Sequence, residues 1–211
     1  IHWACQASGI TIVPVNWRSK PDEIDFYVHN AEVKLAFVEP ISLENMQASV
    51  SAQTLPYVIC DANHASPAYD TFSQIISTGR DVEPRASVED WSVMLYTSGT
   101  TGRPKGVPRR HRAERAAALA HIAQNQYRMN EVTIGVMPLY HTMGVRSLLA
   151  LCMLNGIFVA FPRWNPELFV KTIENESVTH LYLVPTLYHD ILGSADFNVK
   201  RVSTVRKLDR K

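Results

Sequence analysis

The sequence predicts an α/β protein in which alternating β-α units form a mostly parallel layered sheet. Short apolar runs rich in β-branched and aromatic residues alternate with amphipathic stretches of helical length along all 211 residues. Strands separated by helices of about ten or more residues are typical of β-α units, whose strands pair in parallel. No internal repeat or low-complexity segment interrupts this alternation. We expect one layered α/β system, which leaves room for two sub-sheets.

The first half of the chain predicts four strands and three helices. The expected strands cover residues 9–15, 34–39, 57–61 and 92–97. A helix is expected over residues 21–33, because Pro21 and two acidic residues stand at its start, where they suit the geometry and dipole of a helix. Further helices are expected near residues 43–53 and 67–78, and residues 79–90 form the best candidate for a surface connection.

The second half continues the alternation. Helices are expected over residues 112–126, 143–154, 165–177 and 186–193, and strands over residues 133–138, 156–161 and 179–185. The apolar stretch 147–161 is interrupted by Asn155 and Gly156, so it is too short for a membrane span. It is interpreted as a buried helix that leads into a buried strand, and no transmembrane segment is expected.

Composition excludes several classes of protein. Hydrophobic residues make up 46% of the chain and charged residues 19%, as in an ordinary globular protein. The net charge of +1 gives no support for nucleic acid or a membrane surface as a partner. Cys5, Cys60 and Cys152 are widely spaced and form neither a zinc pattern nor a disulfide framework. Free, buried thiols in a reducing compartment are expected, which favours a cytoplasmic location, and no metal site is predicted.

Residues 96–106, YTSGTTGRPKG, carry the strongest chemical signal. The glycines let backbone approach a ligand closely, and the hydroxyls that follow Tyr96 would surround an anion with donors. Lys105 would add a compact positive charge, so polyphosphate is the expected ligand. The stretch is not a Walker loop, because Lys105 is followed by glycine rather than by Ser or Thr. The alternative is an ordinary surface turn, since Ser, Thr and Gly are common turn residues.

Residues 96–107, YTSGTTGRPKGV, resemble the phosphate-loop signature of the adenylate-forming superfamily. This superfamily comprises acyl- and aryl-CoA synthetases, firefly-type luciferases and the adenylation domains of peptide synthetases. Three further segments resemble the same enzymes: residues 137–144 (MPLYHTMG), residues 181–192 (LYLVPTLYHDIL) and the opening region 4–39. The resemblance therefore covers most of the chain.

The resemblance implies an acid–CoA ligase that uses ATP, Mg²⁺ and coenzyme A to activate a carboxylic acid through an acyl-adenylate. It assigns the ATP phosphates to Thr97, Ser98, Gly99, Thr100, Thr101, Gly102, Arg103, Pro104 and Lys105. It also implies a substrate pocket with Met137, His141, Met143 and Gly144, and catalytic roles for Lys105 and His141.

Several of these assignments have structural alternatives. His141 would orient the acid or gate the pocket, but a histidine after a strand often makes only a hydrogen bond in a half-buried site. The two methionines suit core packing equally well. Arg146 either extends to solvent or meets an acidic group. The arginines of residues 109–115 form either a solvated helix face or a basic rim that attracts the phosphates of ATP or coenzyme A.

The resemblance also implies that residues 1–211 are a partial N-terminal adenylation domain. The motif that contacts adenine and Mg²⁺, the end of the large domain and the C-terminal lid domain are absent from the sequence. We therefore expect the isolated chain to be inactive and to self-associate through exposed apolar surface. The alternatives are a non-catalytic nucleotide- or pyrophosphate-binding fragment, a peptide-synthetase adenylation domain and a luciferase-like domain. The sequence does not identify the acid.

Overall fold

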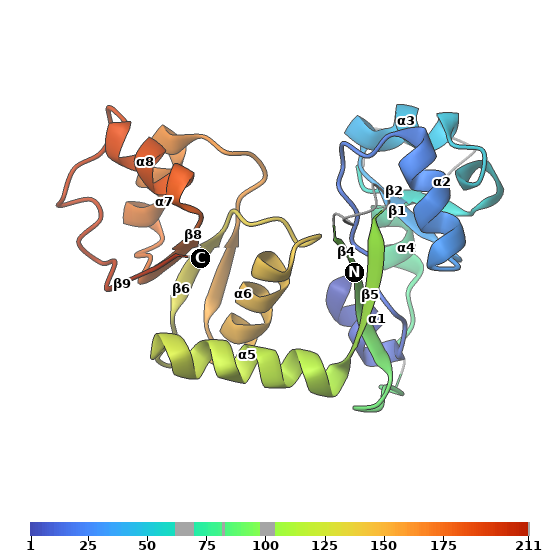
Figure 1. The fold of residues 1–211 in the computed structure, drawn as a ribbon, viewed down its shortest axis with the longest axis horizontal. Helices are drawn as coiled ribbons and strands as arrows, with labels where there is room; N and C mark the ends of the chain where they lie inside the picture. The colour runs from blue at the N-terminus through green and yellow to red at the C-terminus, as the bar shows by residue number, and fades with distance from the viewer. Residues whose placement is uncertain (62–69, 82, 98–103, 211) are drawn as a thin grey trace. The chain divides into compact units, whose positions relative to one another are not determined.

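The computed structural model describes residues 1–61, 70–81, 83–97 and 104–210. The chain divides into two compact units, Ile1–Arg109 and Arg110–Lys211. Both are built from helices and short strands, coloured along the chain in Figure 1.

The first unit contains a three-stranded parallel sheet in the order β1-β2-β3, flanked by short helices. The sheet register pairs Ala36 with Tyr57 and Ile59 with Thr71. The elements of this unit are α1 (His2–Ser8), α2 (Pro21–Asn30), β1 (Ala36–Val38), η1 (Pro40–Ser42), α3 (Leu43–Ala48), η2 (Ala52–Thr54), β2 (Tyr57–Ile59), β3 (Asp70–Thr71), α4 (Phe72–Thr78), β4 (Trp91–Thr97) and β5 (Lys105–Arg110).

Helix α2 begins where the sequence predicts it and is held firmly. Pro21 occupies the first turn, and the backbone N–H of Lys20 donates to the Glu23 carboxylate at 2.8 Å. The Asp25 carboxylate accepts hydrogen bonds from Ser49 Oγ at 2.6 Å and from the Ser51 backbone N–H at 2.7 Å. These bonds lower the pKa of Asp25 and attach α2 to the segment that precedes β2.

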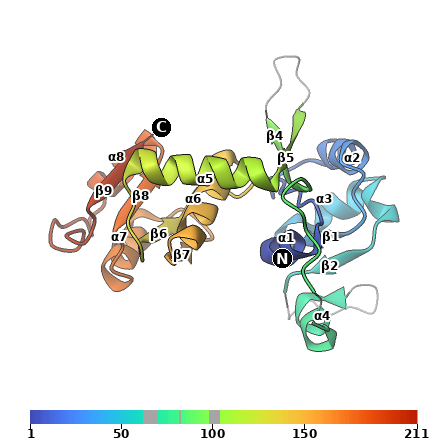
Figure 2. The ribbon, with the colours of Figure 1, turned by 90° about the horizontal axis from the view of Figure 1, so that it is seen from below.

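Strands β4 and β5 pair with each other and form a two-stranded sheet, seen side by side in Figure 2. The connection from Thr97 to Lys105 is shorter than the roughly dozen residues that a parallel crossover needs, so the pair is an antiparallel hairpin. The sequence did not predict β5, because its residues KGVPRR lack a β-strand composition.

The predicted strand over residues 9–15 is wrong in extent. Only Ile12 pairs, through a parallel bridge to Val93, with its N–H donating to the Ser92 carbonyl at 3.1 Å. Gly9 ends α1 in the left-handed conformation with φ of 70°, and Pro14 has no N–H for a sheet hydrogen bond. A run of β-branched residues between them is therefore reduced to one paired position.

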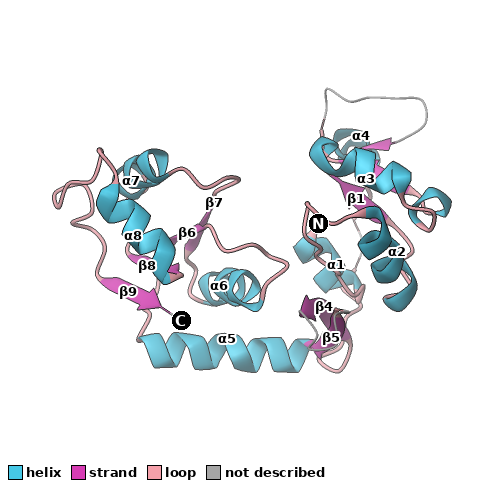
Figure 3. Cartoon of the chain, turned by 45° about the horizontal axis from the view of Figure 1, so that its top comes forward, coloured by secondary structure: helices cyan, strands magenta, loops and turns pink. Residues whose placement is uncertain are grey.

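The second unit is a parallel β-α system, as Figure 3 shows by the alternation of helices and strands. Strands β6 and β7 pair in parallel, as do β8 and β9. The Thr179 N–H donates to the Val132 carbonyl at 2.9 Å, which places β8 beside β6. The elements are α5 (His111–Asn125), β6 (Val132–Gly135), α6 (Thr142–Met153), β7 (Ile157–Ala160), α7 (Pro166–Asn175), β8 (His180–Leu183), α8 (Pro185–Gly193) and β9 (Lys207–Arg210).

The core of the second unit forms where α7 and α8 pack on these strands. Asn165 caps α7 by accepting a hydrogen bond from the Leu168 N–H at 2.7 Å, and Pro166 follows at the first helical position. The fully buried face of the helix consists of Phe169, Val170 and Ile173. The expected α/β class with parallel strands is confirmed.

Burial around residues 147–161 differs from the expectation. Cys152 is exposed on α6, and Ile157 on β7 is 57% exposed. Cys5 and Cys60 are half-buried rather than buried as expected, and the three thiols are free. Within the described part of the chain β7 has β6 on one side and no strand partner on the other, so it is half-exposed rather than buried. Among the described residues, no helix combines the length and apolar character needed to cross a membrane.

A buried ionic network joins the starts of three strands in the second unit. The Glu131 carboxylate, 2% exposed, accepts hydrogen bonds from Arg206 Nη2 at 2.7 Å, from the Arg128 N–H at 2.9 Å and from Thr179 Oγ1. Burial opposes its ionisation, but hydrogen bonds from Thr179, from the Arg128 backbone N–H and from Arg206, together with the charge of Arg206, lower the pKa of the Glu131 carboxyl. The fully buried His180 ring lies 3.8 Å from this carboxylate, from Nδ1 to Oε2.

We expect Phe169→Ala to destabilise the second unit by roughly 3–5 kcal/mol, because it removes a fully buried aromatic ring. Urea unfolding followed by circular dichroism measures the change. Leu168→Ala on the same helix is the matched control, since Leu168 is 53% exposed and its truncation should cost less than about 0.5 kcal/mol. Equal losses for the two variants would contradict the assigned core.

We also expect the stability of the second unit to fall as the pH drops from neutrality. Burial, together with the charge of Arg146, lowers the pKa of His121 to about 4. Burial also lowers the pKa of His180 to about 4, although Glu131 opposes that shift. The pKa of histidine in the unfolded state is about 6.5, so below that pH the unfolded state binds more protons than the folded state. The stabilisation from neutral histidines is complete above this value and is lost as the pH falls toward 4.

The check is the free energy of unfolding measured from pH 7 to pH 4 for the wild type and His180→Gln. Each buried histidine contributes up to about 1.4 kcal/mol per pH unit, so the variant should show a shallower slope. An unchanged slope would contradict this account of His180.

Candidate functional site

The described ends of the predicted phosphate loop lie together at one end of the β4–β5 hairpin. Thr97 is the exposed last residue of β4, and Lys105 is the exposed first residue of β5. Pro104 beside it is half-buried. The other residues assigned to ATP phosphates, Ser98, Gly99, Thr100, Thr101, Gly102 and Arg103, lie outside the described residues.

Thr97 and Lys105 also belong to the same face of the hairpin. Side chains alternate between the two faces of a strand, so Thr97 and Tyr96 point in opposite directions. A Cβ added to Gly106 would lie 2.0 Å from Met94 Cε and 3.2 Å from Tyr96 Cε1, so Gly106 belongs to the face of Met94 and Tyr96. Lys105 therefore belongs to the opposite face, with Thr97. A hydroxyl and an ammonium group on one face suit an anionic ligand.

His141 lies where the chain leaves β6 and enters α6. It is the N-cap residue of α6, and its side chain is exposed. Its backbone N–H donates to the Pro138 carbonyl at 3.0 Å, and its ring lies 4.6 Å from the Tyr140 ring between centroids. The segment after a parallel strand is where α/β proteins commonly bind ligands. The imidazole can therefore reach a ligand from a fixed backbone position.

The other residues assigned to the substrate pocket are more deeply packed. Met143 is 8% exposed, and Met137 packs against the core cluster of the second unit. A Cβ added to Gly144 would lie 2.3 Å from the Pro138 carbonyl oxygen and 2.4 Å from that of Met137. Only glycine lets α6 approach the 137–138 backbone this closely. Gly144 thus sets the place of the N-terminus of α6, which carries His141.

Arg146 follows on the same helix and is half-buried. Its Nε atom is buried and makes no hydrogen bond within the residues that the structure describes. Its charge also contributes to the lowered pKa of His121 on α5. The Arg146 side chain therefore lies toward α5, a direction that neither of the two alternatives from the sequence had specified.

The two groups of assigned residues belong to different units. The hairpin ends lie in Ile1–Arg109, and His141, Met137, Met143 and Gly144 lie in Arg110–Lys211. Each group keeps its own local geometry as described. Among the described residues, no group of three His, Cys, Asp or Glu side chains could hold a metal ion.

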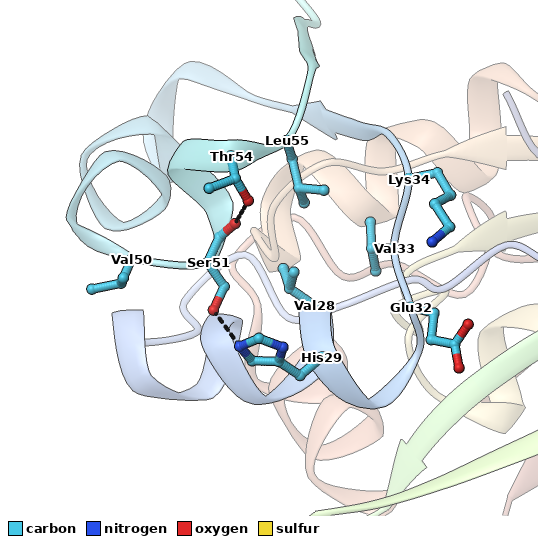
Figure 4. A pocket seen from close by; sticks show the side chains of 9 residues that line it. All are labelled: Val28, His29, Glu32, Val33, Lys34, Val50, Ser51, Thr54 and Leu55. Atoms are coloured by element: carbon cyan, nitrogen blue, oxygen red, sulfur yellow. Dashed lines mark hydrogen bonds between the residues drawn. The ribbon is translucent and has the colours of Figure 1, made fainter.

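A groove of about 580 Å³ in the first unit contains none of the residues assigned from the sequence. Figure 4 shows that the end of α2 and the segment around η2 line this groove, and that its apolar side chains are Val28, Val33, Val50 and Leu55. Ser51 Oγ lies 2.9 Å from His29 Nε2, and Thr54 Oγ1 donates to the Ser51 carbonyl at 2.9 Å. No sequence motif marked this groove, because its residues come from separate segments.

Comparison with known proteins gives consistent matches over the chain. A family model described as AMP-binding enzyme matches residues 1–208. The 4-hydroxybutyrate–CoA ligase 2 of Metallosphaera sedula is 29% identical over 192 residues, which cover 86% of this chain and 35% of the relative. A 2-succinylbenzoate–CoA ligase of Staphylococcus aureus is 28% identical over 198 residues, which cover 88% of this chain and 40% of the relative. The chain thus spans well under half the length of these two relatives.

Solved structures share the fold. A putative long-chain-fatty-acid CoA ligase from Rhodopseudomonas palustris matches with a TM-score of 0.85 and 19% identity, covering 100% of this chain and 53% of the other. A luciferase-like enzyme from the mealworm Zophobas morio matches with a TM-score of 0.83 and 20% identity, covering 96% and 48%. ATP-bound MatB from R. palustris matches with a TM-score of 0.82 and 21% identity, covering 99% and 41%.

We expect Gly144→Ala to lower the stability of the second unit by roughly 1–3 kcal/mol, because its Cβ would overlap two backbone carbonyl oxygens that cannot move as a side chain can. Thermal or urea unfolding measures the effect. Gly193→Ala is the control, since nothing lies within 4 Å of a Cβ at the end of α8. If both variants melted like the wild type, the close approach of α6 would not constrain residue 144.

Proposed function

This chain belongs to the AMP-binding enzyme family, and we propose from that premise that its protein is an ATP-dependent acid–CoA ligase. The observation that carries the proposal is the family match over residues 1–208, together with two relatives that are both CoA ligases by name. In the proposed reaction a carboxylate attacks the α-phosphate of ATP, which forms an acyl-adenylate and releases pyrophosphate. The thiol of coenzyme A then attacks the acyl carbon, and AMP leaves.

Lys105 and Thr97 are proposed to act on the phosphates that leave as pyrophosphate. Lys105 is exposed on the same face of the hairpin as Thr97, where its ammonium group can neutralise growing negative charge. The Thr97 hydroxyl can donate to a phosphate oxygen. Displacement at phosphorus depends mostly on positioning and charge neutralisation, which these two side chains supply. Residues 98–103 are proposed to complete the site with backbone N–H groups and hydroxyls.

His141 is proposed to contact the carboxylate of the acid substrate. Its exposed ring stands at the N-terminus of α6, where the helix dipole favours negative charge. Met137 and Met143 would face the apolar part of the acid where they are accessible. Both aliphatic and aromatic carboxylates are candidates for the acid substrate.

Mg²⁺ is proposed to enter with ATP. Mg²⁺ keeps several waters and binds through substrate phosphates and one or two carboxylates, so it needs no cage of three protein side chains. The hydroxyl and ammonium donors at Thr97 and Lys105 suit the phosphate oxygens that Mg²⁺ leaves free. The ion would supply further charge neutralisation at those oxygens.

We expect Lys105→Ala to weaken binding of Mg·ATP by roughly 10- to 100-fold, since a hydrogen bond to a charged group contributes about 1.5–3 kcal/mol. Isothermal titration calorimetry of the 211-residue chain measures the dissociation constant. Lys34→Ala is the matched control, because it removes the same charge from another exposed site of the first unit and should leave the affinity unchanged.

Equal affinities of the two lysine variants for Mg·ATP would show that Lys105 does not bind the phosphates. For the ligase activity, the longest polypeptide that the gene encodes is tested for exchange of labelled pyrophosphate into ATP across a panel of carboxylic acids. Exchange that depends on one acid would identify the substrate. ATP binding without exchange for any acid would favour a non-catalytic nucleotide-binding role.

A further inference from the structure

The end of the β4–β5 hairpin that carries Thr97 and Lys105 rests on the last turn of α2. The Tyr96 hydroxyl donates a hydrogen bond to Asn30 Oδ1 at 2.8 Å. The Tyr96 ring lies 4.5 Å from the Tyr27 ring and 5.9 Å from the Phe26 ring between centroids, so three aromatic side chains meet at this contact. Asn30 and Tyr96 are 66 positions apart in the sequence. The contact therefore joins α2 to the strand that leads into the predicted phosphate loop.

This contact also reaches the other strand of the hairpin at Gly106. A Cβ added to Gly106 would lie 2.9 Å from Asn30 Oδ1 and 3.2 Å from Tyr96 Cε1. The oxygen that accepts the Tyr96 hydrogen bond thus lies directly over the Gly106 backbone. Lys105 is the neighbouring residue, and a shift of Gly106 would move Lys105 with it.

Helix α2 is itself a fixed support. Ile24 and Tyr27 are buried, and the Asp25 carboxylate is bonded to Ser49 and Ser51. An acceptor on a rigid helix holds its donor more closely than an acceptor on a flexible segment, because less conformational freedom remains to be lost. The Asn30 side chain is accordingly well placed to fix the hairpin.

We propose that Asn30 and Tyr96 are positioning residues for Lys105, because their hydrogen bond over Gly106 holds the start of β5 against α2 and so sets the place of the Lys105 ammonium group. The role in ATP binding rests on the proposed function. The restraint on the start of β5 is independent of the proposed function. Neither Asn30 nor Tyr96 contacts the nucleotide in this proposal.

The test compares Asn30→Ala, Tyr96→Phe and the double variant of the 211-residue chain. Tyr96→Phe removes the hydroxyl and keeps the ring against Tyr27. Calorimetry with Mg·ATP should show about three- to tenfold weaker binding for each single variant, the effect of one lost neutral hydrogen bond. The double variant should be no weaker than the singles, because both remove the same bond. His29→Ala is the matched control, since it removes a side-chain hydrogen bond of α2 to Ser51, away from the hairpin.

Exchange of the backbone amides of residues 105–107, 109 and 110 gives a second readout that does not need ATP, since Pro104 and Pro108 carry no amide proton. Exchange should be faster in Asn30→Ala and Tyr96→Phe than in the wild type, and unchanged in His29→Ala. Asn30→Asp should restore slow exchange, because its carboxylate still accepts the Tyr96 hydroxyl. The melting temperature should stay within about 2 °C of the wild type, since the bond is exposed.

The two readouts separate the possible failures. If the wild type does not bind Mg·ATP, the proposed nucleotide site fails for these residues, and the exchange data alone decide whether the restraint exists. Unchanged exchange in Asn30→Ala would overturn the restraint. Faster exchange with unchanged Mg·ATP affinity, in a wild type that binds, would overturn the positioning role and leave a purely structural contact.

Discussion

The buried carboxylate of Glu131 is the interaction on which the second unit depends. A carboxylate with 2% exposure is stable only when its desolvation is offset by close partners, and Arg206, Thr179 and the Arg128 backbone provide them. These groups come from the starts of β6, β8 and β9, so one charge fixes the relative positions of three strands. His121 and His180 are neutral at pH 7 because burial lowers the pKa of each to about 4, although the charge of Glu131 opposes the shift of His180.

Parallel pairing gives this network a consequence for function. The starts of parallel strands meet at one edge of the sheet and their ends meet at the other. The ionic network occupies the first edge, and the segment that leads to His141 leaves from the end of β6. The stabilising network therefore lies at the starts of the strands, and the residue proposed to contact the substrate follows the end of β6. This arrangement is common in α/β enzymes.

In the first unit the equivalent support is α2. Its Asp25 is bonded to the segment before β2, and its aromatic residues and Asn30 contact Tyr96 of the hairpin. A short two-stranded ribbon is only marginally stable without packing against another element. The end of the hairpin that carries Thr97 and Lys105 is therefore packed against a helix far away in the sequence, while Ile12 pairs with Val93 farther along β4.

The sequence by itself determined the family, the α/β class and most helices. A dozen neighbouring residues are enough for the phosphate-loop signature, and local chemistry such as Pro21 and Asn165 at helix starts marks element boundaries. Only the tertiary structure showed that residues 9–15 pair at Ile12 alone and that KGVPRR forms β5. It also showed that Cys152 is exposed and that the carbonyl oxygens of Met137 and Pro138 approach Gly144 too closely for any side chain there. The contact between Asn30 and Tyr96 is likewise visible only in the tertiary structure. These features depend on contacts between residues far apart in the chain, and neither composition nor periodicity within a short window carries the distance between such residues.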